Sequence, residues 1–227
     1  MIELLRQSGS SFAGDINNLI LLVTVLAGFW LIVAEVVLFW LIWKFRKKPG
    51  VKAQYITGER KEEMKWIHWP HNIILVCDIF IIFFAIKVWY HVKQELPPAQ
   101  STIRVIGQQW AWRFVMPGAD NVLGTKDDIE TVDELHLKVD TTYHYKLESV
   151  DVLHDFSIVQ FRLKQDAIPG RIMTGWFKPT KVGQFDIQCA EMCGIGHGIM
   201  MGKLFVESPE EYDKWIASHT PAEATSH

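Results

Sequence analysis

Residues 19–43 form an apolar run of 25 residues, in which only Thr24, Gly28 and Glu35 are not strongly apolar. A helix of that length spans about 37 Å at roughly 1.5 Å per residue, which is enough to cross a bilayer with some tilt. A cleaved signal peptide has a shorter apolar stretch followed by small residues at its cleavage site, and a buried core helix is typically shorter. The run therefore predicts a transmembrane helix over residues 19–43, preceded by an arm over residues 1–18.

A second apolar run over residues 73–90 is interrupted only by Cys77, Asp78 and Lys87. Aromatic side chains flank it, as is typical of membrane–water interfaces: Trp66, Trp69, Trp89 and Tyr90. Pro70 suits the first turn of a helix, where a missing N–H costs little. The pattern predicts a second transmembrane helix over residues 66–92. The ionisable residues within the two runs, Glu35 and Asp78, are expected to face protein or water.

The segment between the two spans, residues 44–65, is strongly basic. It holds eight Lys or Arg against three Glu, whereas residues 97–227 hold 12 Lys or Arg against 18 Asp or Glu, a difference of 12 − 18 = −6. Basic loops stay on the cytoplasmic side, so the hairpin is expected to place both termini on the opposite face. Because the basic charge is confined to one short loop, a general affinity for nucleic acid is not expected.

From residue 97 onward the pattern changes to short apolar runs separated by Gly and Pro, which is typical of a β-sandwich or Greek-key barrel. The predicted strands cover residues 102–106, 110–115, 134–139, 144–147, 155–159, 172–177, 184–189 and 203–206. Ser208-Pro209-Glu210-Glu211 has the signature of a helix start, with a capping Ser and Pro at the first position. We expect the β domain over residues 97–207, and a short helix with a flexible tail over residues 208–227.

Four candidate metal ligands lie within twelve residues: Cys189, Cys193, His197 and Met200. Thiolate and thioether are soft ligands that favour copper, and imidazole also suits it. A disulfide between Cys189 and Cys193 is a competing interpretation outside the cytoplasm, but it gives no reason for His197 and Met200. Zinc with these ligands is disfavoured because Met binds it poorly. No Cys-x-x-Cys-His occurs, so no c-type haem is expected in this chain.

The pattern Cys-x-Glu-x-Cys-x-x-x-His-x-x-Met, with Val152-Leu153-His154 before it, resembles the binuclear copper (CuA) site of the cytochrome c oxidase subunit II family. Residues 107–112 (Gly-Gln-Gln-Trp-Ala-Trp) resemble its aromatic motif, and residues 163–171 resemble its loop facing subunit I. Together with the hairpin, the resemblance covers roughly residues 19–207. It implies a two-helix transmembrane hairpin followed by an all-β, cupredoxin-like Greek-key sandwich or barrel.

The resemblance also implies roles for individual residues. The copper ligands would be the thiolates of Cys189 and Cys193, the imidazoles of His154 and His197, the thioether of Met200 and the backbone carbonyl of Glu191. The Glu191 side chain would reach a Mg²⁺ or Mn²⁺ shared with subunit I. Trp110 would be the entry point for electrons, and Glu63, three residues before Trp66, would lie at the entry to a proton channel.

The implied function is electron entry into a haem-copper cytochrome c oxidase, a proton-translocating oxidoreductase whose oxygen chemistry resides in subunit I. The expected partners are subunit I, other oxidase subunits, cytochrome c or a cytochrome c domain, and membrane lipid. A bacterial plasma membrane is favoured over the mitochondrial inner membrane. Two alternatives stay open: the second subunit of a CuA-containing nitric oxide reductase, and a membrane-anchored protein that binds and delivers copper. A quinol oxidase subunit is disfavoured because it should lack Cys189 and Cys193.

Three features depart from the family pattern. Ala111 stands where Tyr is usual between the two Trp residues, and Asp155 stands where Ser is usual after His154. The third is the acidic segment over residues 118–130, for which a solvated loop is the favoured interpretation. Partner docking and a calcium loop are the alternatives, although the segment lacks the EF-hand pattern.

Overall fold

The computed structural model describes residues 8–53 and 55–221. The chain divides into two compact units. One unit is a helical hairpin, Asn17–Tyr90, and the other is a β domain that combines Met1–Ile16 with His91–His227. The expected flexible tail lies largely beyond residue 221 and so outside the described residues.

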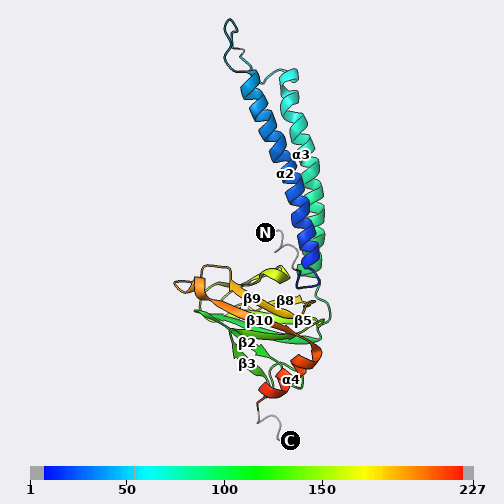
Figure 1. Ribbon diagram of the computed structural model, residues 1–227, viewed down its shortest axis with the longest axis vertical. Helices are drawn as coiled ribbons and strands as arrows, with labels where there is room; N and C mark the ends of the chain where they lie inside the picture. The colour runs from blue at the N-terminus through cyan, green and yellow to red at the C-terminus, as the bar shows by residue number, and fades with distance from the viewer. Residues whose placement is uncertain (1–7, 54, 222–227) are drawn as a thin grey trace. The chain divides into compact units, whose positions relative to one another are not determined.

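The hairpin consists of α2 (Ala13–Lys44) and α3 (Lys61–Trp89), which lie side by side in Figure 1. A short π-helical turn, η1 (Tyr90–Gln94), follows α3. Both helices are long and apolar enough to cross a membrane, and the most apolar stretch of each has no buried residue. Their apolar side chains therefore face outward, as the side chains of lipid-facing helices do.

Both helices begin earlier than the sequence predicts, at residues 13 and 61 instead of 19 and 66. The predicted position of Pro70 in the first turn is wrong, because Pro70 lies inside α3. Residues 61–65 are mostly charged, so the sequence predicted them to be part of the loop. Lys, Glu and Met are nevertheless good helix formers, and the helix therefore begins at residue 61. A proline inside a transmembrane helix is tolerated where neighbouring groups satisfy the freed carbonyl.

In the part of the chain that the structure describes, the β domain contains ten strands in two five-stranded sheets. The first sheet has the order β3-β2-β1-β5-β8 and the second β4-β10-β9-β6-β7. The strand bounds are β1 Ser101–Gln108, β2 Ala111–Met116, β3 Ile129–Val132, β4 Glu134–Lys138, β5 Tyr143–Ser149, β6 His154–Ile158, β7 Leu163–Ala167, β8 Met173–Phe177, β9 Gly183–Cys189 and β10 Met201–Glu207. Pairing is mostly antiparallel, with parallel pairs at β1–β5 and β4–β10.

The sandwich expected from the sequence is confirmed, and each of the eight predicted strands overlaps an observed one. Two strands were missed. β3 continues the acidic segment, and β7 lies inside the stretch read as a loop facing subunit I. Polar or charged side chains occupy two of the four positions of β3 and three of the five positions of β7, so neither strand shows apolar alternation. Buried aromatic side chains fill the space between the sheets: Trp112, Phe114, Tyr143, Tyr145, Phe156 and Phe177.

The N-terminal residues 8–13 belong to the β domain. The Gly9 amide donates to the carbonyl of Gln160 (2.8 Å), and the Thr180 amide donates to the carbonyl of Gly9 (2.9 Å). Phe12 is fully buried and lies edge-on against Trp176, with ring centroids 5.3 Å apart. At the other end of the domain, α4 (Pro209–His219) begins with the predicted Ser208 cap, whose hydroxyl accepts from the Glu211 amide.

Candidate metal centre

Two strands of the second sheet and the loop that follows one of them position the predicted ligands. His154 begins β6, Cys189 ends β9, and Cys193, His197 and Met200 follow in the loop between β9 and β10. Strands β6 and β9 are neighbours, with Phe156 opposite Cys189. The Ala190 amide donates to the carbonyl of Asp155 (3.0 Å), which holds the start of the loop beside β6. Residues 35 positions apart in the chain thus meet at one end of the sheet.

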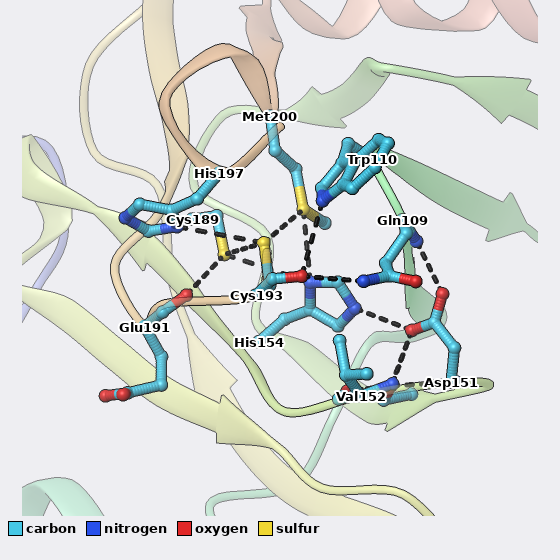
Figure 2. A network of polar contacts seen from close by, with 11 residues as sticks. Gln109, Trp110, Asp151, Val152, His154, Cys189, Glu191, Cys193, His197 and Met200 are labelled. Atoms are coloured by element: carbon cyan, nitrogen blue, oxygen red, sulfur yellow. Dashed lines mark hydrogen bonds and ion pairs between the residues drawn. The ribbon is translucent and has the colours of Figure 1, made fainter. Parts of the chain in front are cut away.

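The predicted ligands converge (Figure 2). Ligand atoms of His154, Cys189 and Cys193 lie within 4.8 Å of one another. The two Sγ atoms are 3.7 Å apart, and the Nδ1 of His197 is 3.7 Å from the Sγ of Cys193. The Sδ of Met200 lies 3.1 Å from the Nδ1 of His154 and 3.8 Å from the Sγ of Cys193. The carbonyl oxygen of Glu191 lies 3.3 Å from the Sγ of Cys189.

Both cysteines are free thiols, so the structure contradicts the disulfide alternative. Their 3.7 Å separation is far longer than the ~2.05 Å of an S–S bond. His154 is fully buried, and Cys189, Cys193 and Met200 are at most 8% exposed. Two thiols, two imidazoles, a thioether and a carbonyl form a soft donor set around one point, which fits copper.

The two thiols share a water-poor environment. Burial, together with the hydrogen bond and the charge of the neighbouring Cys189, raises the pKa of Cys193 to about 11. A thiol must lose its proton to bind a metal, so a cation held between the sulfurs would reverse this shift. Without a cation, the pair is therefore unsuited to being two bare thiolates at neutral pH.

The orientation of His154 is set by a residue that the sequence analysis did not assign. The carboxylate of Asp151 accepts a hydrogen bond from the Nε2 of His154 (2.8 Å), which leaves Nδ1 facing the sulfur atoms (Figure 2). On the other side, a Cβ on Gly107 would lie 3.0 Å from the His154 ring, so the absence of a side chain there makes room for it. Trp112 packs edge-on against the same ring at 6.0 Å.

Asp151 is itself held by several donors. Its carboxylate accepts from the amides of Gln109 and Val152, both at 2.6 Å. Burial opposes ionisation, but the hydrogen bonds from His154 and from these amides keep the pKa of Asp151 below its ordinary value. The carboxylate stays charged and fixes the ring of His154, as carboxylates that accept a hydrogen bond from a metal-binding histidine do. The sequence signal that could have identified Asp151 is its position three residues before His154.

The turn between β1 and β2 rests on the ligand loop. The Nε2 of Gln109 and the Nε1 of Trp110 both donate to the carbonyl of Cys193, at 2.8 and 3.3 Å. A Cβ on Gly196 would lie 2.4 Å from the indole of Trp110, so this glycine permits the close approach. Trp110 remains 39% exposed. One edge of its ring therefore contacts the ligand loop while the rest is open to solvent.

Two further carboxylates lie near the ligands. The side chain of Glu191 is exposed and points away from the sulfur atoms in Figure 2. Asp155, the departure noted after His154, is 2% exposed and sits opposite Asp166 across β6 and β7. Burial and a hydrogen bond with Asp166 raise the pKa of Asp155 to about 7. The carboxylate of Asp155, which replaces the usual Ser, is therefore buried inside the β domain.

The remaining candidates lie elsewhere. Glu63 is in the hairpin unit, where its carboxylate accepts from the Gly58 amide (3.0 Å) and lies 3.8 Å from the Nε of Arg60. In the acidic segment, the carboxylates of Asp120, Asp127 and Asp128 accept hydrogen bonds from amides of the same segment. Within residues 8–53 and 55–221, the only group of three or more His, Cys, Asp or Glu ligands is the one at Cys189.

Comparison with known proteins places the chain in a family. Residues 101–207 match the family model described as "Cytochrome C oxidase subunit II, periplasmic domain". The alternative cytochrome c oxidase subunit 2 of Bradyrhizobium diazoefficiens is 31% identical over 215 residues, covering 83% of this chain and 76% of that protein. The cytochrome c oxidase subunit 2 of Synechocystis is 40% identical over 124 residues, covering 55% of this chain and 35% of that protein.

A solved structure agrees. The periplasmic domain of subunit II of cytochrome oxidase from Bradyrhizobium japonicum superposes with a TM-score of 0.50 at 28% identity, covering 55% of this chain and 96% of that one. The two long apolar helices and the match to a periplasmic domain support a membrane protein with its C-terminal domain on the periplasmic side. The expected class, a subunit of an oxidoreductase, is confirmed with the family. The chain belongs to the cytochrome c oxidase subunit II family.

Proposed function

We propose that this chain is the electron-entry subunit of a haem-copper cytochrome c oxidase. The observation that carries the proposal is the convergence of six predicted ligands, with neighbouring sulfur and nitrogen atoms 3.1–3.9 Å apart and the Glu191 carbonyl 3.3 Å from the Sγ of Cys189. A binuclear copper centre bound there would supply one-electron transfer at low cost in structural rearrangement. The residues of this chain would hold, orient and shield it.

Each ligand has a role in the proposal. The thiolates of Cys189 and Cys193 and the imidazoles of His154 and His197 would hold the copper. Met200 and the Glu191 carbonyl would complete the set as weaker ligands. The hydrogen bond that His154 donates to Asp151 and the one that Gln109 donates to the Cys193 carbonyl hold these ligands in place. A preorganised shell changes little between oxidation states, which favours fast transfer.

Trp110 is the proposed entry point for electrons from a cytochrome c. Its indole contacts the carbonyl of a proposed ligand, Cys193, and still reaches the surface. The net charge of −6 over residues 97–227 favours a basic donor protein through charge steering. Electrons would continue to haem in subunit I, for oxygen reduction coupled to proton pumping. The Glu191 side chain would bind Mg²⁺ or Mn²⁺ at that junction, and Glu63 would lie at a proton-channel entry.

The burial of the ligands argues against copper delivery, which needs exposed and labile ligands. The oxidase complex containing Cys193→Ser, compared with one containing Cys77→Ser, tests the proposal. Cys77 lies in α3, outside the ligand cluster. We expect Cys193→Ser to lose copper and the oxidation of reduced cytochrome c, while Cys77→Ser keeps both. Oxygen consumption by the intact complex would support the oxidase, whereas consumption of nitric oxide alone would identify a nitric oxide reductase.

A further inference from the structure

The hairpin unit contains a large apolar groove between its two helices. The groove has a volume of about 1030 Å³. Its lining includes two small residues of α2, Ala27 and Ala34, and larger residues of both helices, among them Trp30, Trp66 and Ile73. Ala27 and Ala34 are seven residues apart and so lie on one helix face, where their size leaves the space open. Glu62 and Lys65 are the only charged residues of its lining.

A smaller hollow of about 380 Å³ adjoins the charged end of this groove. The two share Lys65 and Trp69. Five of its six lining residues carry hydrogen-bond donors, namely Lys61, Lys65, His68, Trp69 and Asn72, and the sixth is Met64. Within the described chain, Lys61 enters no ion pair. Lys65 pairs with Glu62 at 2.8 Å, but both side chains are more than half exposed, so the pair neutralises little of its charge.

The dimensions match one leaflet of a membrane. The groove lining on α3 runs from Glu62 to Ile74, which spans about 18 Å at roughly 1.5 Å per residue. Half of a bilayer of roughly 40–45 Å, headgroup regions included, is about 20–22 Å. Trp66 and Trp69 mark the polar end, as interfacial tryptophans do. The periplasmic β domain and two spans put this end at the cytoplasmic leaflet, where anionic lipids gather and basic pockets between helices bind them.

We propose that the groove and the hollow together bind one anionic glycerophospholipid of the cytoplasmic leaflet. An acyl chain lies between α2 and α3, and the phosphate lies in the hollow near Lys61 and Lys65. His68, which lies between the two interfacial tryptophans in the sequence, supplies a further donor to the headgroup. The choice of an anionic lipid rests on charge complementarity with the two lysines and on the depth of the groove. The site is separate from the copper ligands, so its failure would leave the proposed electron-entry function untouched.

The headgroup part can be tested on the full-length chain in phosphatidylcholine bilayers. Electron paramagnetic resonance of chain-end spin-labelled lipids would compare the association of phosphatidylglycerol and phosphatidylcholine carrying the same acyl chains. We expect phosphatidylglycerol to associate about fivefold or more tightly. Lys61→Gln should reduce that preference roughly fivefold, the equivalent of the ~1 kcal/mol that a lysine near the membrane surface contributes. Lys48→Gln removes the same charge from the loop outside both cavities and should have a much smaller effect.

A second pair of variants tests the binding of the acyl chain in the groove. Ala34→Trp fills the groove and should reduce the association of both lipids, whereas Val36→Trp adds the same ring at an exposed position of α2 outside the lining. Equal association of both lipids with the unmodified chain would overturn the proposal. So would equal effects of Lys61→Gln and Lys48→Gln, or of the two Trp variants. Loss of the restricted lipid in the assembled oxidase would show that a neighbouring subunit fills the groove instead.

Discussion

At the scale of single residues, the site depends on groups that are not ligands. Asp151 holds the Nε2 of His154 and directs Nδ1 toward the sulfur atoms. We expect Asp151→Asn to lower copper affinity by roughly 10–100-fold, because the carboxylate that orients the ring is lost. Competition with a copper chelator would measure this. Asp186→Asn is the control, since its carboxylate is exposed and bonds only Lys203 among the described contacts. Equal affinities of the two variants would contradict the role of Asp151.

Two glycines of the ligand loop provide a second residue-scale prediction. A Cβ on Gly196 would meet the Trp110 indole at 2.4 Å, whereas a Cβ on Gly198 would meet nothing within 4 Å. Gly196→Ala should therefore displace Trp110 and slow electron transfer from reduced cytochrome c by tenfold or more (about 1.4 kcal/mol in barrier). Gly198→Ala should leave the rate within a factor of about two. Stopped-flow kinetics on the oxidase complex would decide, and unchanged kinetics in Gly196→Ala would remove Trp110 from the electron path.

At the scale of elements, the N-terminal arm is part of the β domain although α2 and α3 separate it from the strands in the chain. Phe12 fills a fully buried position against Trp176. Phe12→Ala should destabilise the β domain by about 3–5 kcal/mol, as large core truncations do. Phe29→Ala is the control, because Phe29 is 56% exposed on α2. Thermal unfolding followed through the near-ultraviolet signal would compare them, and matched unfolding temperatures would show that the arm does not support the domain.

The elements also show where prediction from the sequence stops. The apolar runs predicted both helices, but the charged first turn of α3 and the interior position of Pro70 were missed. An apolar run marks only the part of a helix that lies in the membrane, whereas charged residues with high helix propensity can extend the helix beyond it. Strands β3 and β7 were missed because neither has an alternating apolar pattern, and each is instead ordered by pairing with a neighbouring strand, β2 or β6. Hydrogen bonds such as that from Gln109 to Cys193 join residues 84 positions apart, which no local pattern reveals.

At the scale of the whole molecule, the chain combines a hairpin of two apolar helices with an acidic β domain that carries a soft ligand set. The resemblance identified six ligand residues, and the structure brings all six together; their roles as copper ligands are proposals. The chain covers 76% of its Bradyrhizobium relative but 35% of the Synechocystis protein, so the activity of the assembled enzyme is proposed from the site and from the family.

The central claim is that the cluster around Cys189 and Cys193 holds two copper ions as one unit. Electron paramagnetic resonance of the full-length chain, purified in detergent and loaded with copper, tests it most directly. The account predicts a signal from one unpaired electron shared equally by two copper nuclei, lost in Cys193→Ser and retained in Cys77→Ser. A signal from a single copper ion, or a copper-free protein in which Cys189 and Cys193 are joined by a disulfide, would contradict it.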